Sequence, residues 1–261
     1  MEIIELLKAV LFGVVEGITE WLPISSTGHM ILLNQFIKLD VSEEFYSMFQ
    51  VVIQLGAILA VVVVFWNNIW PFGRRNNKEP LARHGILSYI KMDIIRLWIK
   101  IIIACVPAAV IGLAFDDKFE AAFYNYQTVA IALIVFGVAF IVIENRHKGK
   151  RSRVRSVAQL SYQMCLLIGV SRVAAAEFTF YLAIPVMFGA SILKIMQFGL
   201  HFTGAEAAIL LTGMIVAFIV SIVVINFLMG YIKKHDFKVF GWYRIVLGII
   251  VLVYFIATAV A

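Results

Sequence analysis

The sequence has 261 residues, of which 62% are hydrophobic and only 15% are charged. A soluble domain is about half apolar and a quarter charged, so this composition excludes an ordinary soluble enzyme and indicates an integral membrane protein. The net charge of +6 suits an anionic partner. Nucleic acid is not expected as that partner, because no folded nucleic-acid-binding motif accompanies the basic residues.

Six stretches are long and apolar enough to cross a bilayer as helices, which needs about 20 residues each. We therefore predict an all-α polytopic membrane protein that forms one integral membrane domain over residues 1–261. Residues 45–143 would supply the first-half spans and residues 157–261 the second half. The six predicted spans are residues 45–73, 97–115, 121–143, 178–193, 207–232 and 245–261.

Lysine and arginine are concentrated in alternate connections between these spans. Seventeen of them lie in residues 74–100, 144–156 and 231–244. Only two lie in the intervening connections. The positive-inside rule therefore makes 144–156 a basic cytoplasmic loop and places the C-terminus outside.

The first 44 residues need a different arrangement, because the span that follows them must begin outside. Residues 9–33 are too apolar for a solvated loop, yet they contain Glu16, Glu20 and Pro23. A charge at the bilayer centre costs at least ~3 kcal/mol. We predict that residues 1–44 form a re-entrant hairpin, which is tolerated where its backbone is buried in protein or lines a wet cavity.

A loose internal echo relates residues 44–60 to residues 177–193, since both begin with Glu-Phe and contain Gly-Ala in an apolar run. The two segments would cross the membrane in opposite directions. That is typical of an inverted repeat, in which a site is expected where the halves meet. Chance is the alternative, because apolar sequences match one another easily.

The most informative stretch is GVVEGITEWLPISSTGH, residues 13–29. Glu16 and Glu20 are four residues apart and would share one helix face, where their charges repel. A hard divalent cation such as Mg²⁺ or Ca²⁺ between them would remove that repulsion. Pro23 would then end or kink the helix.

The residues after the proline offer groups for binding and transferring a phosphate. Ser25, Ser26, Thr27 and Gly28 supply hydroxyls and backbone N–H groups for a phosphate cradle. His29 could act as the base for a hydroxyl nucleophile or protonate a leaving group. The structural alternative is that the hydroxyls cap the next helix and the histidine is a hydrogen-bonded core residue.

Three segments give the chain a resemblance to a known family. VVEGITEWLPISSTGHM (14–30), FQVVIQLGAILAVVVVFW (49–66) and SRVAAAEFTFYLAIPVMFG (171–189) resemble bacterial undecaprenyl-diphosphate phosphatases, which are known for bacitracin resistance. The resemblance implies metal-dependent hydrolysis of a polyprenyl diphosphate, the lipid carrier of cell-wall synthesis, to its monophosphate and phosphate. It also implies an inverted repeat with two re-entrant hairpins in the bacterial plasma membrane, and a site facing outward.

The resemblance assigns roles to the residues already singled out. We also expect membrane lipids to surround the protein, and the sequence leaves open whether it forms a homodimer. The implied roles are Glu16 and Glu20 for the metal or attacking water, Ser26 as nucleophile, Ser25, Thr27 and Gly28 at the phosphate, and His29 as acid or base.

One part of the family pattern is missing. The family has a second signature, Pro-Gly-x-Ser-Arg-Ser-Gly-Ala-Thr, whose arginine grips the diphosphate. Here residues 163–167 are followed almost directly by Gly-Val-Ser-Arg at 169–172, and residues 174–185 fit the family's next segment. Arg172 then belongs to a later Ser-Arg pair, and a segment of about twenty residues is absent.

This departure leaves several interpretations open. The native protein carries residues that this sequence lacks, or it is a true variant with weak or no phosphatase activity. A transporter or flippase of the polyprenyl phosphate carrier is the alternative from another class, because inverted repeats with broken helices are a transporter architecture. The last alternative is a non-functional paralogue.

Overall fold

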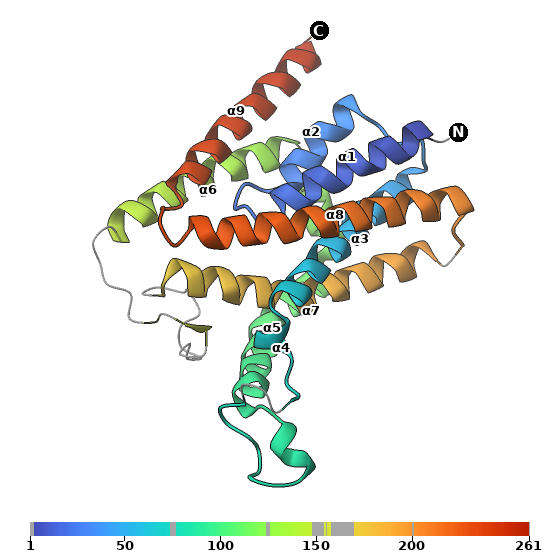
Figure 1. Ribbon diagram of the computed structural model, residues 1–261. Helices are drawn as coiled ribbons and strands as arrows, with labels where there is room; N and C mark the ends of the chain where they lie inside the picture. Colours follow the sequence, from blue (N-terminus) through green and yellow to red (C-terminus); the bar gives the residue numbers. More distant parts are fainter. Residues whose placement is uncertain are drawn as a thin grey trace.

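The computed structural model describes residues 3–73, 77–123, 126–147, 154, 156–157, 170–199 and 201–260. Within these ranges the chain is helical and forms no strand beyond isolated bridges, which confirms the all-α prediction. Figure 1 shows the helices. They are α1 (Ile3–Thr19), α2 (Ser26–Phe36), α3 (Glu43–Val64), α4 (Trp66–Ile69), the 3₁₀ helix η1 (Ile86–Tyr89), α5 (Met92–Phe123), α6 (Tyr126–His147), α7 (Arg172–Phe198), α8 (Gly204–Tyr231) and α9 (Lys238–Val260).

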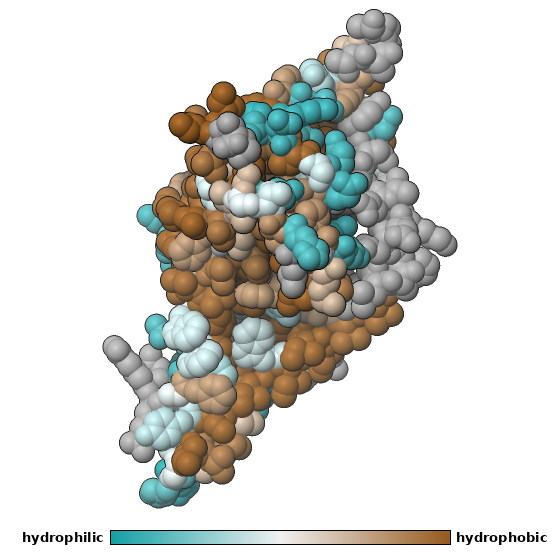
Figure 2. All heavy atoms as spheres, turned by 90° about the vertical axis from the view of Figure 1, so that its right-hand side faces the viewer, coloured by the Kyte–Doolittle hydropathy of each residue, from teal (hydrophilic) through white to brown (hydrophobic). Residues whose placement is uncertain are grey.

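Five described helices, α3, α6, α7, α8 and α9, are long and apolar enough to span a membrane. They coincide with five of the six predicted spans. The sixth, 97–115, lies inside α5, where the side chains of 112–123 are outside the described part. A row of exposed apolar residues follows one face of α8 at helical spacing: Ile215, Ile219, Val223 and Phe227. Figure 2 shows a broad hydrophobic surface between hydrophilic groups, as expected for a multi-pass membrane protein.

The first residues fold as a helical hairpin of α1 and α2. Its two ends are tied together, since Lys8 Nζ donates to the carbonyl of Lys38 at 2.6 Å and the N–H of Asp40 donates to Glu5 at 2.8 Å. The turn between the helices contains Pro23. The hairpin has the predicted shape, while its depth in a membrane remains a prediction.

Two glycines let α1 lie directly against α8. Gly13 faces the backbone of Gly213, and Gly17 faces Ala217 and Val220. A side chain at either glycine would meet backbone atoms of α8, so the G-x-x-x-G spacing permits close helix packing. This contact fixes the helix that carries Glu16.

Helices α3 and α7 pack side by side in opposite directions. Phe45, at the start of α3, contacts Phe198 at the end of α7, and their ring centroids are 5.8 Å apart. At the other ends, the rings of Phe65 and Tyr181 are 5.4 Å apart. The two segments of the sequence echo therefore run antiparallel, as predicted.

Helices α6 and α9 form an antiparallel pair that supports α2. Gly137 on α6 faces Gly241 on α9, and Ala130 faces Gly248. A small apolar cluster joins the pair to α2 through Leu32. The last helix of the chain is therefore held next to the hydroxyl-rich start of α2.

Candidate functional site

Glu16 is the most deeply buried charged side chain of the hairpin. It is 0% exposed, and neither of its carboxylate oxygens has a hydrogen-bond partner among the described residues. The carboxylate of Glu20, one helical turn later, lies close enough to interact electrostatically with that of Glu16. Because an unpaired buried carboxylate is costly when charged, Glu16 is either protonated or neutralised by a cation.

The turn after Glu20 brings the first hydroxyls back toward α1. Ser25 has a φ of +73°, a conformation that non-glycine residues rarely adopt, and it is the only such residue in the described part of the chain. Its Oγ accepts a hydrogen bond from the N–H of Gly28 and caps α2. Strained residues of this kind are concentrated at functional sites.

Ser26 is paired with Glu20 rather than with the histidine. Its Oγ donates a hydrogen bond of 2.5 Å to Oε2 of Glu20. A hydroxyl bonded to a carboxylate has the arrangement of a nucleophile and its base. The sequence singled out both residues, but it suggested His29 as the base for a hydroxyl, and the structure presents Glu20 instead.

His29 makes two hydrogen bonds with different partners. Its Nδ1 lies 2.7 Å from the carbonyl oxygen of Ser25, and its Nε2 lies 2.7 Å from the hydroxyl of Tyr243 on α9. A carbonyl only accepts, so Nδ1 carries a proton. In the neutral ring Nε2 is then the acceptor, and the Tyr243 hydroxyl donates to it.

A hard divalent cation fits the Glu16–Glu20 pair in part. The unpartnered oxygens of Glu16 and the carboxylate of Glu20 are suitable oxygen ligands. Among the described residues no group of three His, Cys, Asp or Glu could hold an ion. The two carboxylates therefore suit an ion of the Mg²⁺ type, which also takes water and substrate phosphate oxygens as ligands.

Arg172 is bonded to a residue outside the hairpin. Its Nε and Nη2 donate to the two carboxylate oxygens of Glu144 at 2.9 and 2.7 Å. Glu144 also accepts from the N–H of Phe237. This bidentate pair joins the end of α6 to the start of α7 and agrees with the interpretation that Arg172 is not the missing arginine.

A cavity of about 300 Å³ lies next to the start of α2. Ser25 and Thr27 line it from the hairpin, Phe136 lines it from α6, and Arg244 lines it from α9. Tyr243 and Arg244 were not among the predicted site residues. The sequence pattern placed Arg244 in the basic connection 231–244, whereas the structure places it inside α9. A charge within an apolar helix was the available signal.

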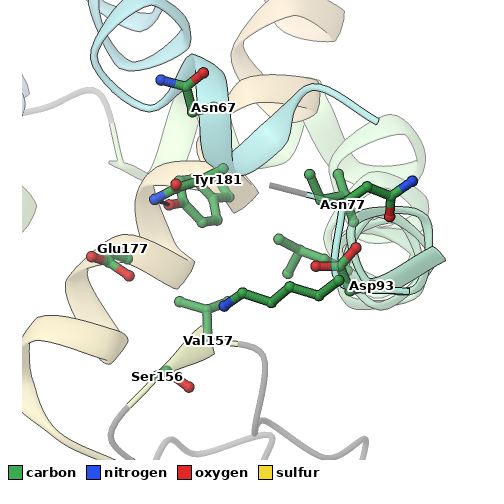
Figure 3. Close-up of a pocket in the computed structure, with 11 residues that line it drawn as sticks. Asn67, Asn77, Asp93, Ser156, Val157, Glu177 and Tyr181 are labelled. Atoms are coloured by element: carbon green, nitrogen blue, oxygen red, sulfur yellow. Dashed lines mark hydrogen bonds between the residues drawn. The ribbon is translucent and has the colours of Figure 1, made fainter. Parts of the chain in front are cut away.

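A larger cavity of about 590 Å³ lies between α4, α5 and α7, and no hairpin residue is among the residues that line it. Figure 3 shows Glu177 and Tyr181 on one side of it and Asn77 and Asp93 on the other. Residues 156–157 also border it, shortly before the part of the sequence where the family's second signature is missing. None of the predicted site residues faces this cavity.

The fold and the hairpin define a class: a multi-pass membrane protein whose first hairpin joins a buried carboxylate pair to a hydroxyl-rich helix start. The chain belongs to the family described as the bacitracin resistance protein BacA, whose model matches residues 9–172 and 155–250. The resemblance seen in the sequence is thereby confirmed.

Relatives with the same printed name match the chain over nearly its whole length. The undecaprenyl-diphosphatase of Desulfitobacterium hafniense is 55% identical over 100% of this chain and 99% of its own length. Undecaprenyl-diphosphatase 1 of Clostridium acetobutylicum is 55% identical, over 98% and 99%. The undecaprenyl-diphosphatase of Enterococcus faecalis is 53% identical, over 97% and 98%.

The comparisons also bear on the missing segment. The match with the Desulfitobacterium relative extends over 286 positions, whereas this chain has 261 residues, so at least 25 positions have no counterpart here. Residues 155–172 are matched by both parts of the family model. This overlap is the pattern expected if the absent positions fall within 155–172.

Proposed function

We propose that the protein hydrolyses undecaprenyl diphosphate to undecaprenyl phosphate and inorganic phosphate, as part of the recycling of the cell-wall lipid carrier. The observation that carries this proposal is the 2.5 Å hydrogen bond from Ser26 to Glu20 at the start of α2. Membership of the family and the names of the relatives supply the substrate.

The geometry suggests two routes to the same products. In one, Ser26 attacks the terminal phosphorus while Glu20 takes the hydroxyl proton, and water then hydrolyses the phosphoserine. In the other, the pair orients a water molecule that attacks directly. A divalent cation bound at Glu16 and Glu20 would neutralise charge on the phosphate oxygens. Both routes break one P–O bond of the diphosphate and consume one water.

His29 is proposed as the acid that serves the leaving lipid phosphate. Its Nε2 is held by Tyr243, so the ring has a fixed orientation beside the start of α2. In the neutral ring Nε2 carries no proton, so His29 acts as the acid in its doubly protonated form, in which Nε2–H is the proton donor. Glu20→Ala, Ser26→Ala and His29→Ala are each expected to abolish phosphate release from a polyprenyl diphosphate with Mg²⁺ or Ca²⁺ present. Release at the wild-type rate from all three variants would refute this site.

We propose that the site receives its substrate from the outer side of the bacterial plasma membrane. Both ends of the hairpin lie on the side that the basic residues predict to be outside. The turn nevertheless reaches far along the bundle, because Trp21 contacts Phe180 near the start of α7, with ring centroids 5.1 Å apart. The diphosphate must therefore enter deeply.

This depth favours one alternative function, transport of the polyprenyl phosphate across the membrane. A Thr27→Cys variant, in a background with Cys105 and Cys165 replaced by serine, separates the two functions. Labelling by an impermeant thiol reagent from outside alone supports the phosphatase proposal. Labelling from both sides, with lipid translocation in proteoliposomes and no phosphate release, supports the transporter.

A further inference from the structure

Arg244 is a partly buried cation that no anion of the described chain neutralises. Its guanidinium lies over the rings of Phe140 and Phe136 on α6, at 5.3 and 6.0 Å from their centroids. Its Nε is fully covered and has no hydrogen-bond acceptor in the part of the chain that the structure describes. Among the described residues, no carboxylate forms an ion pair with it.

Two other described arginines have carboxylate partners. Arg172 is paired with Glu144, and Arg96 with Glu79, each at 2.7 Å. Withdrawing a charge from water without a partner is costly, and contact with aromatic faces offsets that cost only in part. The environment of Arg244 is therefore that of a cation whose anion is a ligand.

The cavity beside Arg244 has the size and the donors for such an anion. Its volume of about 300 Å³ is at the lower end of the range for small-molecule sites. Ser25 and Thr27 contribute hydroxyls, and the described residues that line the cavity include no carboxylate. The first N–H groups of α2 have no carbonyl partner within the helix, and their dipole favours a negative charge.

We propose that Arg244 is a phosphate-binding residue, which with Ser25 and Thr27 holds the diphosphate of a polyprenyl diphosphate at the start of α2. The identity of the lipid rests on the proposed function, whereas the phosphate site itself rests on the cavity and its unpaired charge. A guanidinium matches phosphate oxygens with two parallel hydrogen bonds. Ser26 separates Ser25 from Thr27 in the sequence and does not itself line the cavity, so a phosphate held here is bound by the two residues that flank Ser26, the hydrogen-bond partner of Glu20.

The test measures binding separately from turnover. In full-length protein carrying Glu20→Gln, calorimetry compares farnesyl diphosphate, inorganic diphosphate and farnesol, which lacks phosphate. Arg244→Gln should weaken binding of both diphosphates about tenfold or more and leave farnesol unchanged. Arg244→Lys keeps the charge but loses the two parallel hydrogen bonds of the guanidinium, so it should weaken diphosphate binding about threefold. Arg96→Gln, outside the cavity, should bind like the parent.

The outcomes separate the phosphate site from the proposed function. Equal diphosphate affinity in the parent and Arg244→Gln overturns the proposal, as does parallel weakening of farnesol or the absence of diphosphate binding by the parent. If Arg244→Gln weakens the binding of farnesyl diphosphate alone, the site binds a diphosphate that is attached to a lipid. If it weakens the binding of both diphosphates, the site binds the phosphate groups themselves. If Arg244→Gln does not fold, Arg244→Lys decides by the same comparison. Lack of phosphate release by the wild type defeats only the proposed function.

Discussion

Nε2 of His29 lies 2.7 Å from the hydroxyl of Tyr243, 214 residues later in the chain. The two rings are also nearly parallel, with an interplanar angle of 6° and centroids 5.6 Å apart. The start of α2 and the second turn of α9 therefore form one site. The hydroxyl donates to the neutral ring, because Nδ1 already donates to the carbonyl of Ser25.

Tyr243→Phe removes this donor and keeps the stacked ring. We expect the rate of phosphate release to fall by up to about tenfold, because a hydrogen bond of this kind contributes about 0.5–1.5 kcal/mol. Steady-state kinetics with a polyprenyl diphosphate measure the effect. Tyr254→Phe, further along α9 beside Phe36, is the matched control. An equal loss in both variants would assign the effect to packing.

The Ser26–Glu20 hydrogen bond predicts strong coupling between the two residues. Glu20→Gln and Ser26→Ala should each lower kcat by at least about 10²-fold, as expected for loss of a general base or its nucleophile. The double variant should be little worse than either single variant, because the two residues act as a unit. Ser191→Ala, whose serine bonds the carbonyl of Val51, is the control.

The same series decides between serine and water as the nucleophile. If Ser26→Ala keeps most of the activity while Glu20→Gln is inactive, the carboxylate activates water. Trapping of a phosphoserine in the wild type would instead establish the serine route.

The buried Glu16 predicts that a divalent cation stabilises the folded protein as well as the reaction. Adding Mg²⁺ or Ca²⁺ to chelator-treated wild type should raise its Tm, since a ligand that binds only the folded state stabilises it. Glu16→Gln should abolish most of this shift and require a higher ion concentration for phosphate release. Glu206→Gln, at the start of α8, should respond like the wild type. An ion-independent Tm in both proteins would argue against this metal site.

Local sequence predicted most of the fold and about half of the site. Apolar runs and basic connections predicted the long helices, because bilayer thickness and charge asymmetry act on contiguous segments. Glu16, Glu20 and His29 stood out because ionisable groups are rare in apolar stretches. Their partners were harder to predict, since only tertiary packing brings Tyr243 to the hairpin.

The two glycines related by the sequence echo show what local pattern does not reveal. A Cβ on Gly56 would overlap the backbone carbonyl of Met214 on α8, whereas nothing lies within 4 Å of a Cβ on Gly189. Gly56→Ala should therefore destabilise the protein by about 1–3 kcal/mol through overpacking. Gly189→Ala should be neutral or slightly stabilising, because alanine favours a helix. Equal Tm values for the two variants would contradict the packing of α3 on α8.

The absent segment predicts that turnover is low and can be raised. An intact mass of 29.3 kDa would first establish that the protein has the length of this sequence. Arg172 cannot serve in place of the missing arginine while Glu144 neutralises its charge and accepts from its Nε and Nη2. Inserting the matching segment of the Desulfitobacterium relative between residues 167 and 169 should raise phosphate release by about tenfold or more, because it restores a guanidinium at the transferred phosphate. The same insertion with its arginine changed to glutamine should not raise phosphate release. Glu144→Gln, which removes the ion pair of Arg172 without the insertion, should not raise it either. A gain that survives loss of the inserted arginine would mean that the segment acts by filling space between the helices rather than by binding phosphate.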